Sequence, residues 1–125
     1  VGQQDPNAIR EAFRAYVEAQ LPADCEVEFH GHGNSAAGQM QIDHPAFEQA
    51  RQALSEEWGL AAAYVGCGGS IPIAGYFKTV LGMDAMLIGF GKDDDQIHSP
   101  NEKYDVESFH KGIRSWARVL EKVMG

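Results

Sequence analysis

The residues best suited to chemistry lie in a polar loop over residues 91–104. A run of three aspartates is followed there by His98 and Glu102. A neutral imidazole nitrogen is a common ligand for zinc. The loop follows an apolar stretch, residues 84–90, and open α/β sheets usually bind ligands just beyond the ends of such strands. The pattern therefore predicts either a metal-ligating His98 or a surface histidine in an acidic loop.

A glycine-rich turn, Gly66-Cys67-Gly68-Gly69-Ser70, is the second candidate. Glycines let a ligand approach the backbone, and a helix that begins after them offers unpaired N–H groups to an anion. The turn has neither the spacing of a dinucleotide-binding fingerprint nor the lysine of a P-loop. An anion site and a plain strand-to-helix turn capped by Ser70 both remain open.

The other polar residues indicate less. His30 and His32 could reach one metal from an extended segment, but no third ligand lies near them in sequence. His44 is expected near a helix cap and His110 on the exposed side of the last helix. Because Ser70 has no recognisable triad around it, we do not predict that it is a nucleophile.

The sequence predicts that helices and short strands alternate along the chain and position these polar residues. Apolar spacing and capping residues predict helices at about residues 6–21, 44–58, 70–81 and 106–123. Strands are expected at residues 25–30, 39–42, 60–65 and 84–90. From residue 60 onward the order is strand, helix, strand, helix, which predicts a βαβα unit of a parallel or mixed sheet. Two strands cannot form a stable sheet alone, so both parts of the chain are expected to belong to larger sheets.

Composition limits the classes of function. The 125 residues are 44% hydrophobic, enough for a packed core, and carry a net charge of −8. A surface of that sign repels phosphate groups, which argues against nucleic-acid and anionic-membrane partners. Two distant cysteines, Cys25 and Cys67, favour reduced thiols and a cytoplasmic protein.

Three motifs in order carry a family resemblance: GGSIP at 68–72, a strand ending in Gly-Phe-Gly at 89–91, and HSPNEK at 98–103. The sequence resembles the C-terminal end of the di-zinc peptidases that include aminoacylases, carnosinase-like dipeptidases, acetylornithine deacetylase, succinyl-diaminopimelate desuccinylase and carboxypeptidase G. The resemblance covers residue 66 to the C-terminus, and the helix around DHPAFEQARQAL also fits.

The resemblance implies a fold in two parts. Residues 1–42 resemble the last helix and strand of an α+β lid domain that also forms the dimer. Residues 43–125 resemble the C-terminal segment of a zinc-peptidase-like α/β catalytic domain. His98 then matches a zinc ligand, Gly69 and Ser70 match the turn at the substrate carboxylate, and Glu102 matches a glutamate beside the ligand loop.

The implied activity is amide hydrolysis in dipeptides or N-acyl amino acids by a two-zinc enzyme, as a homodimer. The family's other ligands and its glutamate base match nothing in this chain, so the chain alone is expected to be inactive. Many dipeptidase-like members carry Arg-Glu where this chain has Gly66-Cys67, so no arginine clamp on the substrate is predicted. The alternative function is a non-catalytic dimerisation or binding fragment.

Overall fold

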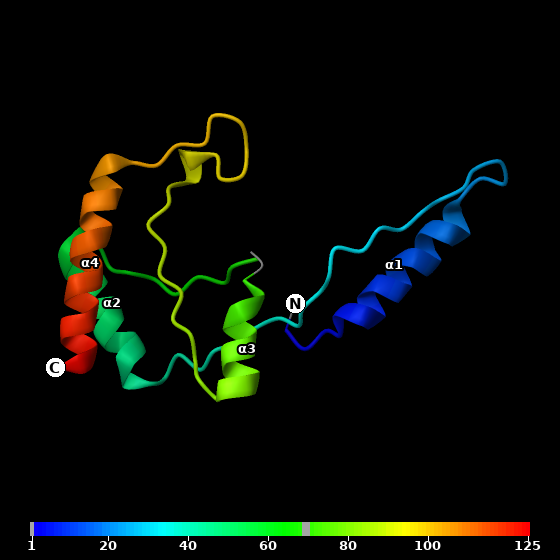
Figure 1. The fold of residues 1–125 in the computed structure, drawn as a ribbon. Helices are drawn as coiled ribbons and strands as arrows, with labels where there is room; N and C mark the ends of the chain where they lie inside the picture. The colour runs from blue at the N-terminus through cyan, green and yellow to red at the C-terminus, as the bar shows by residue number, and fades with distance from the viewer. Residues whose placement is uncertain (1, 69–70) are drawn as a thin grey trace. The chain divides into compact units, whose positions relative to one another are not determined.

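A computed structural model describes residues 2–68 and 71–125 (Figure 1). Four α-helices and one short 3₁₀ helix form within these residues: α1 Pro6–Gln20, α2 Pro45–Trp58, α3 Pro72–Leu81, η1 Asp93–Asp95 and α4 Val106–Met124. Contacts group the chain into two units, Val1–Met40 with Gly69–Ala85, and Gln41–Gly68 with Met86–Gly125. No helix in the described part of the chain is both long and apolar enough to cross a membrane.

Local capping chemistry sets the helix boundaries. The Asp5 carboxylate accepts the N–H of Asn7 at the start of α1, and His44 Nδ1 accepts the N–H of Ala46 at the start of α2. Gly59 and Gly82 end α2 and α3 with φ near +67°, a conformation that glycine adopts without steric cost. All four predicted helices are confirmed within one or two residues.

The start of α3 differs from the prediction. Ile71, not Ser70, occupies the N-cap position, and it makes no side-chain capping hydrogen bond. Pro72 takes the first helical position, where its fixed φ and missing N–H are tolerated, and this places the cap at residue 71. Gly69 and Ser70 themselves lie outside the described residues, so the expected anion-binding turn stays a prediction.

In the first unit, the segment that follows α1 turns back along the helix (Figure 1). The rings of Phe13 and Phe29 meet edge to face at 6.3 Å, and the Arg14 guanidinium lies 5.4 Å from the centre of the Phe29 ring. Asn34 donates to Asn7 at 2.6 Å. These are contacts between exposed or half-buried side chains, and no residue of α1 is buried.

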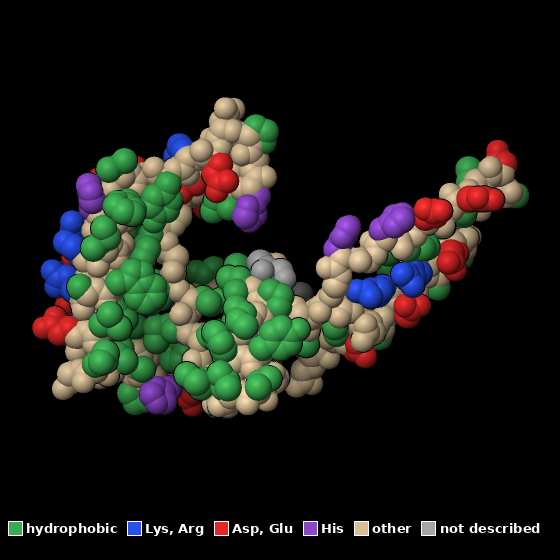
Figure 2. All heavy atoms as spheres, in the orientation of Figure 1, with side chains coloured by type: hydrophobic (Ala, Val, Ile, Leu, Met, Phe, Trp, Pro, Cys, Tyr) green, Lys and Arg blue, Asp and Glu red, His purple; other side chains and the backbone are tan. Residues whose placement is uncertain are grey.

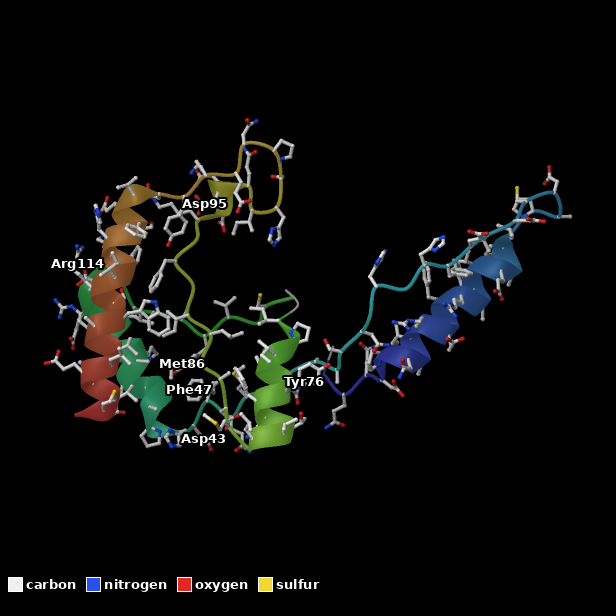
Figure 3. All side chains as sticks on the ribbon, in the orientation of Figure 1. Asp43, Phe47, Tyr76, Met86, Asp95 and Arg114 are labelled. Atoms are coloured by element: carbon white, nitrogen blue, oxygen red, sulfur yellow. The ribbon has the colours of Figure 1, made fainter. Side chains whose placement is uncertain are left out.

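The second unit is built on the contact between α2 and α4. Small side chains lie at the contact, where Ala50, Ala53 and Val119 are buried together. Met86 packs against this cluster from the segment before the polar loop. Figure 3 labels Met86 beside Phe47, a residue of α2 that is also buried. Small residues let two helix backbones approach closely, and the buried cluster between α2 and α4 is small.

Polar contacts tie the same two helices together. Arg114 and Arg118 donate to the two carboxylate oxygens of Glu57 at 2.6 and 2.9 Å. Only 6% of the Glu57 side chain is exposed. The hydrogen bond from Arg114 lowers the pKa of Glu57, so this carboxylate stays ionised at neutral pH.

Trp58 joins the helix pair to the segment that leads into the polar loop. Its Nε1–H donates to the Ser115 hydroxyl at 2.9 Å, and its ring stacks on Phe90 at 5.7 Å. Lys111 Nζ lies 5.2 Å from the centre of the Trp58 ring. Ser115 is fully buried at 0% exposure, so Trp58 supplies a hydrogen bond that water cannot replace.

We expect Trp58→Phe to lower the free energy of unfolding by about 1–3 kcal/mol, because a buried hydroxyl loses its partner. Denaturant titration measures the change. The same substitution made on a Ser115→Ala background should cost clearly less, since no hydroxyl is then left unsatisfied. An equal cost on both backgrounds would show that the indole ring matters only through its packing.

The predicted strands are not confirmed. The described residues contain no strand, and residues 25–30, 39–42, 60–65 and 84–90 make no strand pairing within them. Leu60 and Val65, expected to be buried, are 76% and 81% exposed. A strand exists only through hydrogen bonds to a neighbour, and the described chain offers these segments none. The expected βαβα unit therefore remains a prediction.

The apolar stripe of α4 faces solvent. Sequence spacing correctly predicts the residues that share this face, but not their burial. The exposed members are Val106, Phe109, Ile113, Trp116, Leu120 and Val123. Figure 2 shows hydrophobic side chains gathered along this helix. A 19-residue helix with one such face is typical of a helix that packs on a sheet, and the described residues form no sheet.

Candidate functional site

The candidate site is the polar loop that joins residues 84–90 to α4. It opens with the 3₁₀ helix η1 and ends at Asp105, the N-cap of α4. All of it belongs to the second unit of the chain. Figure 3 labels Asp95 at the end of η1, where the loop turns outward.

Asp95 holds the two ends of this loop together. Its Oδ2 accepts the backbone N–H of Lys92 at 2.8 Å, and its Oδ1 accepts from Lys103 Nζ at 3.3 Å. The backbone N–H of Lys103 donates to the Asp95 carbonyl oxygen at 3.0 Å. Asp95 is 1% exposed, whereas Asp93 and Asp94 are exposed.

Further ion pairs surround Asp95 on the surface. Lys103 Nζ lies 2.9 Å from an Asp94 oxygen, and its hydrogen bond lowers the pKa of Asp94. Lys92 Nζ lies 2.9 Å from an Asp105 oxygen. Pairs this exposed stabilise a protein little. Their role is to set the direction in which the loop enters and leaves, and Asp95 provides the buried anchor.

Between Asp95 and Lys103 the backbone takes an uncommon path. Gln96, His98 and Asn101 have φ values of 53°, 63° and 64°, in the left-handed region. That conformation costs a residue with a Cβ about 1–2 kcal/mol. Turn hydrogen bonds from Ser99 to Gln96 and from Glu102 to Ser99 help to hold it. The contacts of Asp95 with Lys92 and Lys103 therefore hold this loop in a backbone conformation that its residues do not favour by themselves.

His98 lies at the outer part of this loop with an exposed side chain. Its backbone N–H donates to Glu102 Oε2 at 3.4 Å, a long hydrogen bond. Within the described residues, the imidazole ring itself makes no hydrogen bond or ion pair. Glu102 thus supports the backbone of His98 rather than its ring, and both ring nitrogens are available to a ligand.

The described residues do not form a complete metal site. No three His, Cys, Asp or Glu side chains gather closely enough among them to hold an ion. A zinc site needs about four ligands, so His98 fits as one member of a set that other residues would complete. No catalytic step can be built from the residues of this loop alone.

A shallow hollow lies on the inner side of the loop. Its lining residues are Gly91, Asp95, Ile97, Glu102, Lys103 and Tyr104. His98 is not among them. The hollow therefore does not include the His98 side chain.

The remaining histidines have ordinary roles. His44 caps α2, as expected. His30 lies 3.4 Å from the Glu28 carboxylate with both side chains exposed, and no group of metal ligands that includes His30 or His32 forms in the described chain. His110 is exposed on α4, and its ring lies 5.7 Å from that of Phe109.

Sequence reasoning missed Asp95. Asp93 and Asp94 are exposed, whereas Asp95 is buried and accepts the Lys92 N–H within a local turn. Three identical residues in a row carry no local signal for which one turns inward. The two lysines that flank the loop, Lys92 and Lys103, are the signal that could have indicated a buried carboxylate between them.

Asp105 offers a test of the loop's geometry by pH. The Lys92 ammonium, followed by the Ser108 N–H, lowers the pKa of Asp105 from 3.8 to about 2. The stabilisation that the carboxylate provides is complete above about pH 4 and is lost as the pH falls through about 2. We expect the Ser108 amide resonance to titrate with a midpoint near pH 2, and near the ordinary value after Lys92→Met. A midpoint near 3.8 in the unsubstituted protein would contradict the Lys92 contact.

Comparison with known proteins gives a family match. Residues 2–122 match the peptidase family M20/M25/M40. The chain is 36% identical over 81 residues to the Cys-Gly metallodipeptidase of Schizosaccharomyces pombe, which covers 65% of this chain and 17% of that protein. It is 37% identical over 75 residues to the Cys-Gly metallodipeptidase of Candida albicans, covering 60% of this chain and 16% of that protein.

The Saccharomyces cerevisiae protein of the same name is 35% identical over 75 residues, which is 60% of this chain and 16% of the relative. The chain therefore spans about a sixth of the length of the curated relatives it matches. No solved structure matches it significantly.

Proposed function

The chain belongs to the peptidase family M20/M25/M40, and from this we propose that it is the C-terminal part of a zinc-dependent dipeptidase. The observation that carries the proposal is the family match over residues 2–122. This range includes the loop of His98, whose imidazole has no partner among the described residues. The relatives are named metallodipeptidases, which favours a peptide substrate.

His98 is proposed as one ligand of a two-zinc site whose other ligands lie outside this chain. When bound, zinc would polarise the amide carbonyl of the substrate. The contribution of this chain is to hold an imidazole in the correct place, with Glu102 supporting its backbone at 3.4 Å.

Gly69 and Ser70 are proposed to bind the carboxylate end of the substrate through backbone N–H groups near the start of α3. The proposal extends to the domain arrangement, with residues 1–42 ending a lid domain that forms a homodimer and residues 43–125 completing the catalytic domain. In that domain, residues 60–65 and 84–90 would pair as strands, and the apolar face of α4 would pack on the sheet. A cytoplasmic location fits two cysteines, both exposed.

The proposal is tested on the full-length protein that contains this chain. Removal of metal by a chelator should abolish hydrolysis of Cys-Gly, and added zinc should restore it. An N-acetyl amino acid of matched side chain serves as the competing substrate, and faster hydrolysis of that compound would indicate a deacylase instead. A full-length protein that hydrolyses neither compound in the presence of zinc would support the alternative of a non-catalytic binding protein.

A further inference from the structure

We propose that Asp95, together with Lys103, is a positioning residue that fixes His98 for metal binding. This inference rests on the proposed function, because it assumes that His98 is a ligand. It adds a role for a buried carboxylate that would touch neither metal nor substrate. The loop it acts on is residues 92–103, called the His98 loop below.

The first support is the way in which Asp95 closes the His98 loop. One carboxylate oxygen accepts from the backbone of Lys92, at the start of the loop, and the other accepts from the side chain of Lys103, at its end. The Asp95 carbonyl oxygen accepts the Lys103 backbone N–H as well. A single side chain, 1% exposed, thus connects both ends and has every acceptor engaged.

The second support is the conformation of the loop between these anchors. Three of its residues, Gln96, His98 and Asn101, have a positive φ although none is glycine. Such a path persists only where surrounding contacts determine it, and such strain is found preferentially at functional sites. Without the Asp95 anchor, we expect the loop to relax toward ordinary backbone angles and to turn His98 away.

The third observation is that no hydrogen bond from the described residues orients the His98 ring. A ligating histidine usually donates its second ring N–H to a carboxylate or carbonyl group that fixes its orientation. No described residue does this for His98, and the one hydrogen bond of its backbone N–H is 3.4 Å long. The placement of the ring therefore depends on the backbone, and the backbone depends on Asp95.

The test compares Asp95→Ala with Asp93→Ala in the full-length enzyme. Both residues are aspartates of η1, but Asp93 is exposed and has no contact with Lys103. Zinc affinity is measured by competition with a chromophoric chelator, and kcat and KM are measured for Cys-Gly. We expect Asp95→Ala to weaken zinc binding by about 10–100-fold, as loss of an outer-sphere support does, and to lower kcat more than KM. Asp93→Ala should behave as the unsubstituted enzyme.

A second readout needs no activity. In the zinc-free protein, Asp95→Ala should speed proteolytic cleavage within residues 92–103, while Asp93→Ala should not. If Asp95→Ala fails to fold, Asp95→Asn and Lys103→Met replace it. Asn keeps an acceptor for the Lys92 N–H but loses the charge opposite Lys103. We therefore expect Asp95→Asn to lose less zinc affinity than Asp95→Ala. Unchanged zinc affinity together with a lower melting temperature would overturn the inference.

His98→Ala, measured beside these variants, separates the two proposals. If His98→Ala retains normal zinc affinity, His98 is not a ligand, and the inference fails together with the ligand assignment on which it rests. The dipeptidase activity itself is tested separately, by hydrolysis of Cys-Gly. If His98→Ala weakens zinc binding while Asp95→Ala and Asp93→Ala both match the unsubstituted enzyme, only the positioning role of Asp95 is overturned.

Discussion

Replacing His98 by alanine in the full-length enzyme should reduce dipeptide hydrolysis by at least about 100-fold, because one direct ligand of a catalytic zinc ion is removed. The zinc bound per protein should fall in parallel. Stability should change little, since His98 is exposed and its ring makes no contact with the core of the second unit. Metal analysis, steady-state kinetics and thermal unfolding measure the three quantities.

His110→Ala is the matched control for this experiment. His110 is also an exposed histidine of the second unit, and it lies on α4 outside the His98 loop. It should leave zinc content and activity unchanged. Near-normal zinc content and activity for His98→Ala itself would show that position 98 is only a surface histidine.

The 125-residue chain alone should show no measurable hydrolysis of dipeptides or N-acyl amino acids. A two-metal site needs several carboxylate and imidazole ligands, and no three such side chains gather within the described part of this chain. The measurement is product formation from Cys-Gly with added zinc, using a preparation whose mass has been verified.

The full-length enzyme at equal molar concentration provides the positive control for that assay. The decisive comparison is with a His98→Ala version of the 125-residue chain. Zinc-dependent turnover that the unsubstituted chain shows and the His98→Ala chain lacks would contradict the view that the remaining ligands lie elsewhere.

The helices of this chain could be predicted from sequence because their signals are local. Asp5 and Asp105 cap α1 and α4, and Gly59 ends α2, each through contacts within a few residues. Amphipathic spacing also identified the apolar face of α4. These features depend on neighbours in sequence, and the chain contains those neighbours.

Strand formation and side-chain burial depend on residues that are distant in sequence. The strands and the burial that we predicted from sequence alone were not confirmed. Residues 60–65 carry the composition of a buried strand, yet Leu60 and Val65 are exposed because nothing within the described chain pairs with them. Trp116 on α4 is also exposed, because no described residue covers its side chain. The region matched in the Schizosaccharomyces pombe relative is only 17% of that protein, so most of its length lies outside the comparison.

The candidate site also has features that depend on local sequence and features that depend on tertiary contacts. His98 and Glu102 could be proposed from a sequence motif, and their roles stay predictions. Asp95 could not be proposed in that way, because burial and the left-handed backbone at Gln96 and His98 arise from tertiary contacts. Identical neighbours such as Asp93 and Asp95 differ only in the direction of their side chains. The proposal that Asp95 is a positioning residue therefore rests on contacts seen in three dimensions.

The most direct test of the central claim is a crystal structure of the zinc-loaded full-length enzyme, with anomalous scattering recorded at the zinc edge. We predict a zinc peak about 2.0–2.1 Å from a ring nitrogen of His98, with every other ligand of that ion supplied by residues outside this chain. Zinc ions that are fully coordinated by other residues, with the His98 ring in solvent, would contradict it.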